Sequence, residues 1–429
     1  MRTLLLAVAA ASFLACPAPT TNPDGSTNSG SDGGSSSSDA GSTTDAGSSS
    51  DAGSMNDAGT SGTDAGPTRG ARLFDPDVLH EVIITVAQAD LMTLDTNQDV
   101  RVPCTISVDG ETVADAGIRK KGQTSLRPLS GKPGFTIKMN EFVPGQKLDG
   151  MKRLTLDNAV EDPSLLTGHI SYEVYRRAGL PAPRTAHATL RFNGEDKGLY
   201  VLEEPTNGDY LEEHFGDGTG NLYEGPWDFQ KGANTADLKD EVSEMRSRAD
   251  LVAFTDVVMN TPTAQLETAL AAHVDLDQFL TNWAVEQVAV LWDNYSVVAW
   301  NYYWYHVPNG RFVILTHGVN WPYWHADYDP FDLNQNPWNT SDPPGRLCVR
   351  LQQIPSVDAR YREELKRVTR DAFDVAVLTA RINRAQTMFQ SRPLTGASAS
   401  GRDDALMRAG EARDFVRDRR AWLGTLLGL

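Results

Sequence analysis

Residues 291–320 read LWDNYSVVAWNYYWYHVPNGRFVILTHGVN, and this stretch decides the predicted fold because one kind of secondary structure changes to another within it. The residues just before it, from about Asp275 to Trp292, repeat apolar side chains at three- and four-residue spacing, which predicts a helix. Inside the stretch, the aromatic and β-branched runs 300–307 and 311–317 flank a Pro-Asn-Gly turn, which predicts a β-hairpin. A helix that leads directly into a hairpin indicates a domain of mixed α and β structure.

The residues before this stretch carry mostly strand signals. Alternating or β-branched runs predict strands at 80–86, 100–108, 111–122, 135–139, 153–158, 188–192 and 197–204. Two turn pairs, Asp109-Gly110 and Asn193-Gly194, are typical of tight hairpins because both residue types tolerate a left-handed backbone. The front half is therefore predicted to be a set of antiparallel hairpins.

Helical signals are concentrated after the quoted stretch. Long helical patterns cover residues 357–391 and 402–427. In the front half one helix is expected, from Pro163, with Asp162 as its N-cap, to Ala178. The predicted fold class is α+β, with a β-rich N-terminal lobe and a mostly helical C-terminal lobe that contains one hairpin. A cleft between two such lobes suits a ligand site.

The first 70 residues are predicted to direct export and to tether the folded body. Residues 1–15 have one basic residue before a short apolar run, as in a signal peptide. They end in Phe-Leu-Ala before Cys16, which resembles a bacterial lipobox; an ordinary signal peptide cleaved nearby is the alternative. Residues 16–70 then form the lipidated cysteine and a disordered Ser/Gly/Asp-rich linker, in which Asp-Ala-Gly recurs five times. We expect a lipoprotein of the bacterial cell envelope or surface, whose folded domain spans 71–429.

Composition excludes several classes of function. Lys and Arg total 39 against 57 Asp and Glu, a formal charge of −18, so phosphate backbones would be repelled and nucleic acid is not expected as a partner. Three cysteines are too few for a disulfide scaffold. With Cys16 lipidated, Cys104 and Cys348 remain, either as a disulfide or as two separate buried thiols.

Two groups of polar residues in the quoted stretch are candidates for chemistry. Asp293 closes the predicted helix among aromatic residues, where a carboxylate could act as a general base; capping the helix end is the alternative. Asn301 begins the hairpin, and His317 and Asn320 follow its second strand. Side-chain oxygens that a hairpin brings together can share magnesium or manganese. His317 could equally be a buried histidine without a ligand.

A third candidate lies in the front half. Gly122-Gln123-Thr124-Ser125 follows a strand, and such a turn offers backbone N–H groups to a phosphate. Lys132 and Lys138 follow it and could contact a phosphate as point charges. The turn is not a P-loop, and lysines at a strand edge on the surface are the alternative.

Two further patterns have ordinary structural explanations. Asp327, Asp329 and Asp332 invite a calcium hypothesis, but they do not match an EF-hand loop, and an acidic surface loop is favoured. The tryptophans of the back half could line a sugar groove, but at strand and hairpin positions they are more typical of a core; they are Trp292, Trp300, Trp304, Trp321, Trp324 and Trp338.

Taken together, four ordered segments resemble the CotH kinase family, the spore-coat-protein-H-like proteins. They are IRKKGQTSL with KPGFTIKMN, the run from RLTLDNAVEDP to KGLYVLEE, the segment LWDNYSVVAWNYYWYHVPNGRFVIL, and GRLCVRLQQIPSVDARYREEL. The resemblance covers most of the body, from about Ile118 to Tyr361. It implies a highly modified protein-kinase-like fold and transfer of phosphate from ATP to serine residues of proteins.

The resemblance also implies roles for individual residues. Asp293 would orient or deprotonate the acceptor hydroxyl, and Lys138 would contact the ATP phosphates, near Ser125 and Lys132. Asn301 would lie near the magnesium or manganese ion. The family's metal-binding Asp falls on Asn320, where a neutral amide stabilises a cation less than a carboxylate does.

Two functions follow from the resemblance. The first is an exported, membrane-anchored kinase that uses ATP and a divalent metal and phosphorylates Ser or Thr of a secreted or surface protein. The second is a catalytically degenerate CotH-like surface module, in which Asn320 marks lost chemistry.

Overall fold

The protein is described here from a computed structural model, which covers residues 69–429 apart from 226–227, 234–235, 240–246, 320–324 and 336–341. Cys16, the linker and Asn320 therefore lie outside the described residues. Backbone contacts place Asp64–Leu429 in one compact unit. None of the described helices combines the length and apolar character that crossing a bilayer requires.

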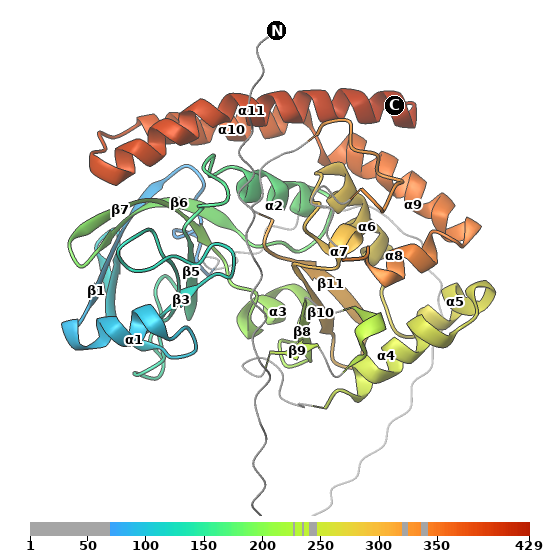
Figure 1. The fold of residues 1–429 in the computed structure, drawn as a ribbon, viewed down its shortest axis with the longest axis horizontal. Helices are drawn as coiled ribbons and strands as arrows, with labels where there is room; N and C mark the ends of the chain where they lie inside the picture. Colours follow the sequence, from blue (N-terminus) through green and yellow to red (C-terminus); the bar gives the residue numbers. More distant parts are fainter. Residues whose placement is uncertain (1–68, 226–227, 234–235, 240–246, 320–324, 336–341) are drawn as a thin grey trace, which may run out of the picture. The chain divides into compact units, whose positions relative to one another are not determined.

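Seven strands close into a barrel in the front half of the unit (Figure 1). They are β1 (Leu79–Val86), β2 (Val102–Val108), β3 (Glu111–Lys121), β4 (Gly134–Lys138), β5 (Arg153–Asp157), β6 (Thr185–Phe192) and β7 (Glu195–Glu203). Their order is β1-β2-β3-β4-β5-β7-β6, and a parallel pairing of β1 with β6 closes the ring of otherwise antiparallel pairs. The predicted strands are confirmed, whereas the closure was not predicted, because pairing between β1 and β6 leaves no local sequence signal.

The barrel is filled by side chains that alternate along each strand. Ile84, Ile106, Ile118 and Ile137 are buried inside it and belong to one apolar cluster. At the hairpin between β2 and β3, Asp109 and Gly110 have φ of 50° and 90°, the left-handed geometry that the turn pair predicts. Because neighbouring residues point to opposite faces, the residues between the buried ones on β3, β4 and β5 face outward, toward the cavity described below.

Helix α2 (Thr167–Arg177) begins four residues later than the sequence predicts. Asp162 does accept hydrogen bonds from backbone N–H groups, those of Ser164 at 3.1 Å and Thr167 at 2.8 Å, but it closes a turn that precedes the helix. Leu165, inside that turn, has φ of 60° and cannot be helical. Asp162 therefore stabilises the turn that precedes α2 and does not cap the first turn of the helix.

A second, four-stranded sheet follows the barrel, with order β11-β10-β8-β9. The predicted hairpin is confirmed as β10 (Tyr302–His306) and β11 (Phe312–Thr316). The expectation of a lone hairpin is wrong, because β8 (Leu222–Glu224) and β9 (Asp237–Leu238) extend it. Strands of two or three residues are too short to show a periodic pattern in the sequence.

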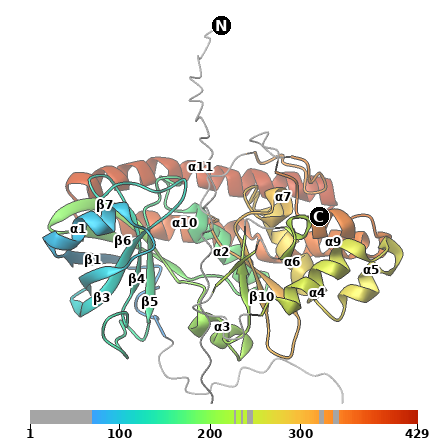
Figure 2. The same cartoon turned by 60° about the horizontal axis from the view of Figure 1, so that its bottom comes forward.

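Helices make up most of the remaining chain and confirm the α+β class. Short elements η1 (Gln88–Asp90), α1 (Leu91–Thr96), α3 (Gly208–Phe215) and η2 (Phe229–Lys231) lie in or near the sheets. The helical core contains α4 (Ala249–Asn260), α5 (Thr263–Leu270), α6 (Leu276–Val288), α7 (Tyr295–Val298), α8 (Arg346–Leu351), α9 (Pro355–Arg367), the π-helix η4 (Val368–Ala372), α10 (Val375–Gln390) and α11 (Gly396–Leu427). The last two helices pack side by side, and α11 also packs on β7 (Figures 1 and 2).

Helix α6 is buried on almost every side and carries the quoted stretch at its end. Its N-terminus is capped as expected, since Asp275 accepts a hydrogen bond from the backbone N–H of Gln278. The helix ends at Val288, four residues before the predicted end, and Val290 then takes φ of 55°. The residues between α6 and β10 therefore form an irregular segment rather than a last helical turn.

The two cysteines of the folded unit are free, buried thiols. Cys104 belongs to the apolar cluster of the barrel, and Cys348 belongs to the cluster of the helical core. The disulfide that the sequence left open is not formed in this structure; the two thiols are separate.

Candidate active site

A cavity of about 500 Å³ lies between the outer face of the barrel and the segment that follows α6. The barrel supplies residues of β3, β4, β5 and the end of β7, and the turn 122–125 borders them. The opposite wall includes Asp293, Trp300, Asn301, Tyr303, His317 and Gly318. The cavity thus joins the turn of the front half to the stretch that decides the fold.

On the barrel side, Lys121 and the buried Asp157 form an ion pair of 2.7 Å between the ends of β3 and β5. Burial opposes the charge of Lys121, but Asp157 and Glu203 outweigh it and raise its pKa. Likewise, burial alone would raise the pKa of Asp157, and Lys121 instead lowers it. The pair therefore stays ionised at neutral pH and presents an ammonium group to the cavity.

Sequence reasoning missed Lys121, although a signal for it exists. Lys120 and Lys121 end the same strand, so alternation sends them to opposite faces. Lys120 contacts Asp95 of α1 at 2.7 Å, away from the cavity, whereas Lys121 lines it. Only the strand register decides which lysine faces the cavity.

Asp293 lies in the irregular segment after α6 and faces the same cavity. The side-chain amide of Asn301 donates to its carboxylate at 2.8 Å and to its backbone carbonyl at 3.0 Å. Burial, with smaller contributions from the negative charges of Glu161 and Asp342, raises the pKa of Asp293 to about 7; the Asn301 hydrogen bond opposes the rise. A carboxyl group that loses its proton near pH 7 is suited to general-base catalysis.

Asn294 holds this segment against the end of the hairpin. Its amide nitrogen donates to the carbonyl of Asn301 at 2.9 Å, to Thr316 Oγ1 at 3.2 Å and to the carbonyl of His317 at 3.3 Å. Although Asn294 is the N-cap of α7, its side chain makes no capping hydrogen bond. The capping explanation therefore does not account for the Asp293-Asn294 pair, whose side chains are used in the site.

His317 is partly buried beside a charged cluster on the same wall. Its ring packs on Tyr303 with centroids 4.3 Å apart, and its Nε2 lies 3.8 Å from Glu224 Oε1. Burial lowers the pKa of His317, with the negative charge of Glu224 opposing. Glu224 is also paired with Lys239, so His317 borders an acid that already has a cation.

The structure brings some of the predicted site residues together and leaves others apart. Ser125, Asn301 and Asp293 line the cavity. Lys138 does not: it lies on the outer face of β4, and its ammonium contacts Glu141 at 2.7 Å. Lys132 does not line it either; its ammonium lies 5.3 Å from the ring centre of Tyr200, and burial lowers its pKa to about 8.

The other candidate patterns behave as structural features where the structure describes them. Asp329 and Asp332 accept from the N–H groups two residues ahead, as in ordinary polar turns. No group of three or more His, Cys, Asp or Glu within the described residues is arranged to hold a metal ion. Trp292 and Trp304 are buried in apolar clusters, while Trp300 lines the cavity.

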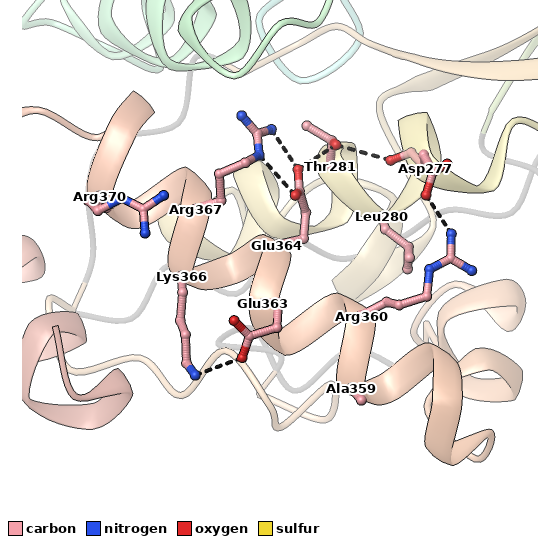
Figure 3. A pocket seen from close by; sticks show the side chains of 10 residues that line it. All are labelled: Asp277, Leu280, Thr281, Ala359, Arg360, Glu363, Glu364, Lys366, Arg367 and Arg370. Carbon is pink, nitrogen blue, oxygen red and sulfur yellow. Dashed lines mark hydrogen bonds and ion pairs between the residues drawn. The ribbon is translucent and has the colours of Figure 1, made fainter. Parts of the chain in front are cut away.

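A second hollow, of about 760 Å³, lies on the surface over α6 and α9 (Figure 3). Its cations are already engaged: Arg360 with Asp277, Lys366 with Glu363 and Arg367 with Glu364. An anion that bound here would replace a carboxylate in one of these ion pairs, so it would gain little free energy. We therefore assign the candidate site to the cavity that contains Asp293.

Comparison with known proteins addresses the family directly. Residues 118–423 match the family described as CotH kinase protein. Among solved structures, this chain is similar to the crystal structure of a Helicobacter pylori proinflammatory kinase, CtkA. The similarity covers 76% of this chain and 92% of that one, with 10% identity and a TM-score of 0.29. A search of curated proteins found no match. Because the family match covers more than half of this chain's length, the chain belongs to the CotH kinase family.

Proposed function

We propose that this protein binds ATP with a divalent cation in the cavity and transfers the γ-phosphate to a Ser or Thr hydroxyl of another protein. The observation that carries the proposal is the position of Asp293, whose pKa is about 7, in the same cavity as the Lys121–Asp157 ion pair. A poised carboxylate and a fixed ammonium are the groups that phosphoryl transfer requires from the protein. Membership of the CotH kinase family supports the same reaction.

Each residue has a distinct role in this proposal. Lys121 would contact phosphate oxygens, a role that we move to it from Lys138, whose ammonium is paired with Glu141. Asp293 would accept the hydroxyl proton while the acceptor oxygen bonds to the γ-phosphorus and the bond from that phosphorus to the bridging oxygen of ADP breaks. Asn301 would keep the Asp293 carboxylate oriented through its 2.8 Å hydrogen bond.

The cavity's own oxygen atoms fit a divalent cation. Oε1 of Glu161 is buried without a hydrogen-bond partner, and Glu161 is close enough to Asp293 for its charge to raise that residue's pKa. Magnesium and manganese prefer oxygen ligands and usually take several of them from substrate phosphates. Glu161 would hold the ion together with oxygens of the substrate phosphates, and Asn301 would lie near it; the ion would neutralise phosphate charge.

Location and acceptor are further parts of the proposal. The signal-like residues 1–15, Cys16 and the polar linker support an exported lipoprotein, with the kinase domain held at a distance from the membrane. The acceptor would then be a protein of the cell envelope or surface. The two-lobed, kinase-like arrangement of the fold belongs to the same proposal, with the cavity between barrel and helical core as its nucleotide site.

One observation favours a second candidate, a surface module that has lost catalysis. The cavity is lined by more carboxylates than cations: Asp157, Glu161, Glu203, Glu204, Glu224 and Asp293 against Arg119, Lys121, Arg153 and Lys239. Two of those cations, Lys121 and Lys239, are paired with acids. Without strong cation binding, such a wall repels a triphosphate, and Asn320 lowers the charge available to hold the cation.

Calorimetric titration of ATP into the full chain, with magnesium, with manganese and with chelator, tests the proposal. We expect cation-dependent binding that weakens at least tenfold in Lys121→Met and stays within twofold in Lys120→Met, the adjacent lysine on the other face. Because Lys121→Met leaves Asp157 buried without a partner, Lys121→Met/Asp157→Leu serves as a second variant that removes both charges.

The results separate the two candidates. Metal-dependent binding, followed by transfer of labelled phosphate from ATP to a library of Ser-containing peptides, supports the kinase. Binding that appears only in Asn320→Asp supports the module that has lost catalysis. Absence of binding in both natural chain and Asn320→Asp overturns the nucleotide site.

A further inference from the structure

We propose that Arg419, on the C-terminal helix α11, is a positioning residue that holds the segment carrying Asp293. The assignment of Asp293 as the base rests on the proposed function, but the contacts of Arg419 do not. Arg419 is separated from this segment by more than a hundred residues in sequence, and its side chain is fully buried.

The guanidinium of Arg419 is surrounded by backbone carbonyl groups. Nε donates to the carbonyl of Val288 at 3.0 Å, and one terminal nitrogen donates to that of Gln287 at 2.7 Å. The other terminal nitrogen donates to the carbonyls of Ala326 and Tyr328 at 2.9 and 2.6 Å. The planar fork of arginine is therefore used in all three directions, which a lysine cannot reproduce.

No carboxylate among the described residues forms an ion pair with this buried charge. Burial lowers the pKa of Arg419 to about 9, with Tyr361 and the more distant Asp327 and Asp329 opposing. The charge is accommodated by the C-terminus of α6, where unpaired carbonyls and the helix dipole favour a cation. Transferring a charge from water to the protein interior costs free energy, so the folded state must make these hydrogen bonds to accommodate the guanidinium of Arg419.

Two of the carbonyls that Arg419 bonds, those of Gln287 and Val288, immediately precede the segment that carries Asp293. The carboxylate of Glu286 accepts from the backbone N–H of Ser296 at 2.8 Å, and the amide of Gln287 donates to Ser296 Oγ at 2.9 Å. The N–H of Leu291 donates to the carbonyl of Glu286 at 2.8 Å. The end of α6 thus ties both ends of the segment, and Arg419 fixes the end of α6.

The other end of α11 is attached to the barrel. Ser398 donates to Asp196 of β7 through its backbone N–H at 3.0 Å and its hydroxyl at 2.6 Å. The two attachment points lie about 30 Å apart along the helix axis. Figures 1 and 2 show α11 extending from the barrel strands to the helical core. A single rigid helix therefore connects the barrel, which carries Lys121, to the base of the segment that carries Asp293.

Arg419→Lys tests the inference, with Arg350→Lys as the matched control. Arg350 is also a buried arginine that donates to carbonyls at a helix end, those of Val258 and Thr261 at the end of α4, and neither of these two hydrogen bonds involves the segment. Lysine keeps the charge in both variants. Hydrogen exchange of residues 289–296, measured at a temperature where both variants remain folded, reports the segment directly.

We expect amide exchange in residues 289–296 to be at least tenfold faster in Arg419→Lys than in the natural chain, and unchanged in Arg350→Lys. Where phosphate transfer is measurable, kcat should fall about 10- to 100-fold with the KM for ATP within twofold, because Asp293 is displaced while the phosphate contacts remain. Arg350→Lys should lower the melting temperature without changing kcat.

The outcomes separate this inference from the proposed function. Unchanged exchange in Arg419→Lys, or equal acceleration in Arg350→Lys, overturns the positioning role. Faster exchange of the segment in Arg419→Lys, when the natural chain shows no ATP turnover, supports the positioning role and counts against the kinase. Faster exchange with normal kcat would show that Arg419 positions the segment's backbone but not its carboxylate, and it overturns the link to Asp293.

Discussion

Asp293 and Lys121 lie in one cavity but respond to burial in opposite ways. The charge of Lys121 is matched by Asp157 at 2.7 Å, so the pair remains ionised despite its burial. Among the described residues, Asp293 accepts a side-chain hydrogen bond from the Asn301 amide alone, so burial, together with nearby negative charge, raises its pKa to about 7. The neighbouring charges, and not the depth of burial, therefore decide whether a residue stays charged or gains and loses a proton near neutral pH.

The first prediction concerns the pH dependence of phosphate transfer. A general base acts when deprotonated, so kcat/KM should rise with pH and level off above an apparent pKa near 7, the value for Asp293. Rates measured from pH 5 to 9 at saturating magnesium check this. A profile that is flat across pH 6 to 8 contradicts the role of Asp293. Asp332→Asn, in an exposed turn outside the cavity, should leave the profile unchanged.

The second prediction concerns Asp293→Asn. Loss of the base should reduce transfer about 10²- to 10⁴-fold. Stability should change in the opposite direction. Because the folded pKa is raised, the folded state retains a proton between about pH 4 and 7, and stability is lost as pH rises through 7.

Asparagine carries no charge, so the Asp293→Asn variant does not lose stability at this position as the pH rises. The variant should therefore be more stable than the natural chain by roughly 1–3 kcal/mol at pH 8 and about equal at pH 4. Thermal unfolding at both pH values measures it. Glu286, whose pKa is also about 7, is present in both proteins and cancels in the comparison. A stability difference independent of pH would contradict the argument.

At the scale of single elements, local signals locate helix ends only where the backbone can follow them. In the structure Asp275 and Asp374 cap α6 and α10, each accepting from backbone N–H groups of the first turn. Asp162 makes similar hydrogen bonds, yet the left-handed Leu165 delays the start of α2. Capping residues therefore predict a helix start only to within about a turn.

The third prediction follows for the two true caps. Asp275→Ala and Asp374→Ala should each lower the free energy of unfolding by about 1 kcal/mol, because each leaves N-terminal N–H groups without their acceptor. Urea unfolding of the two variants measures this. Asp275 also contacts Arg311 at 3.1 Å on the surface, which adds little. A cost at Asp275 several times that at Asp374 would show that the ion pair, not the cap, matters.

At the scale of the whole molecule, the barrel and the helical core bury separate apolar clusters that α11 connects. Cys104 and Cys348 belong to different clusters, which is why neither can reach the other. Burial raises the pKa of the Cys104 thiol to about 12 and that of Cys348 well above its usual range. Both should be inert in the folded state, since the thiolate is the reactive form.

The fourth prediction concerns these thiols. Iodoacetamide should label neither Cys104 nor Cys348 in the native protein and should label both after denaturation. Dithiothreitol should leave the melting temperature unchanged. Peptide mapping without reductant checks both points, and a peptide that links Cys104 to Cys348 would contradict the structure. Cys16 lies outside the folded unit and is mapped separately.

The sequence alone determined the local elements, because their signals are local. Alternation and turn pairs predicted the hairpins of the barrel, and helical patterns predicted helix over the residues of α6, α9, α10 and α11, without the break between α9 and α10. The ordered motifs pointed to the CotH kinase family, and the segment after α6 supplied Asp293 and Asn301 as two of the candidate site residues. Each of these depends on residues within one or two elements.

Only the tertiary structure decided which distant residues meet. The parallel pairing of β1 with β6 closes the barrel, and the register of β3 turns Lys121 rather than Lys120 toward the cavity. Arg419 reaches the end of α6 from the last helix of the chain. Contacts of this kind depend on strand register and helix packing over the whole unit, and burial then sets the charges of the groups that meet.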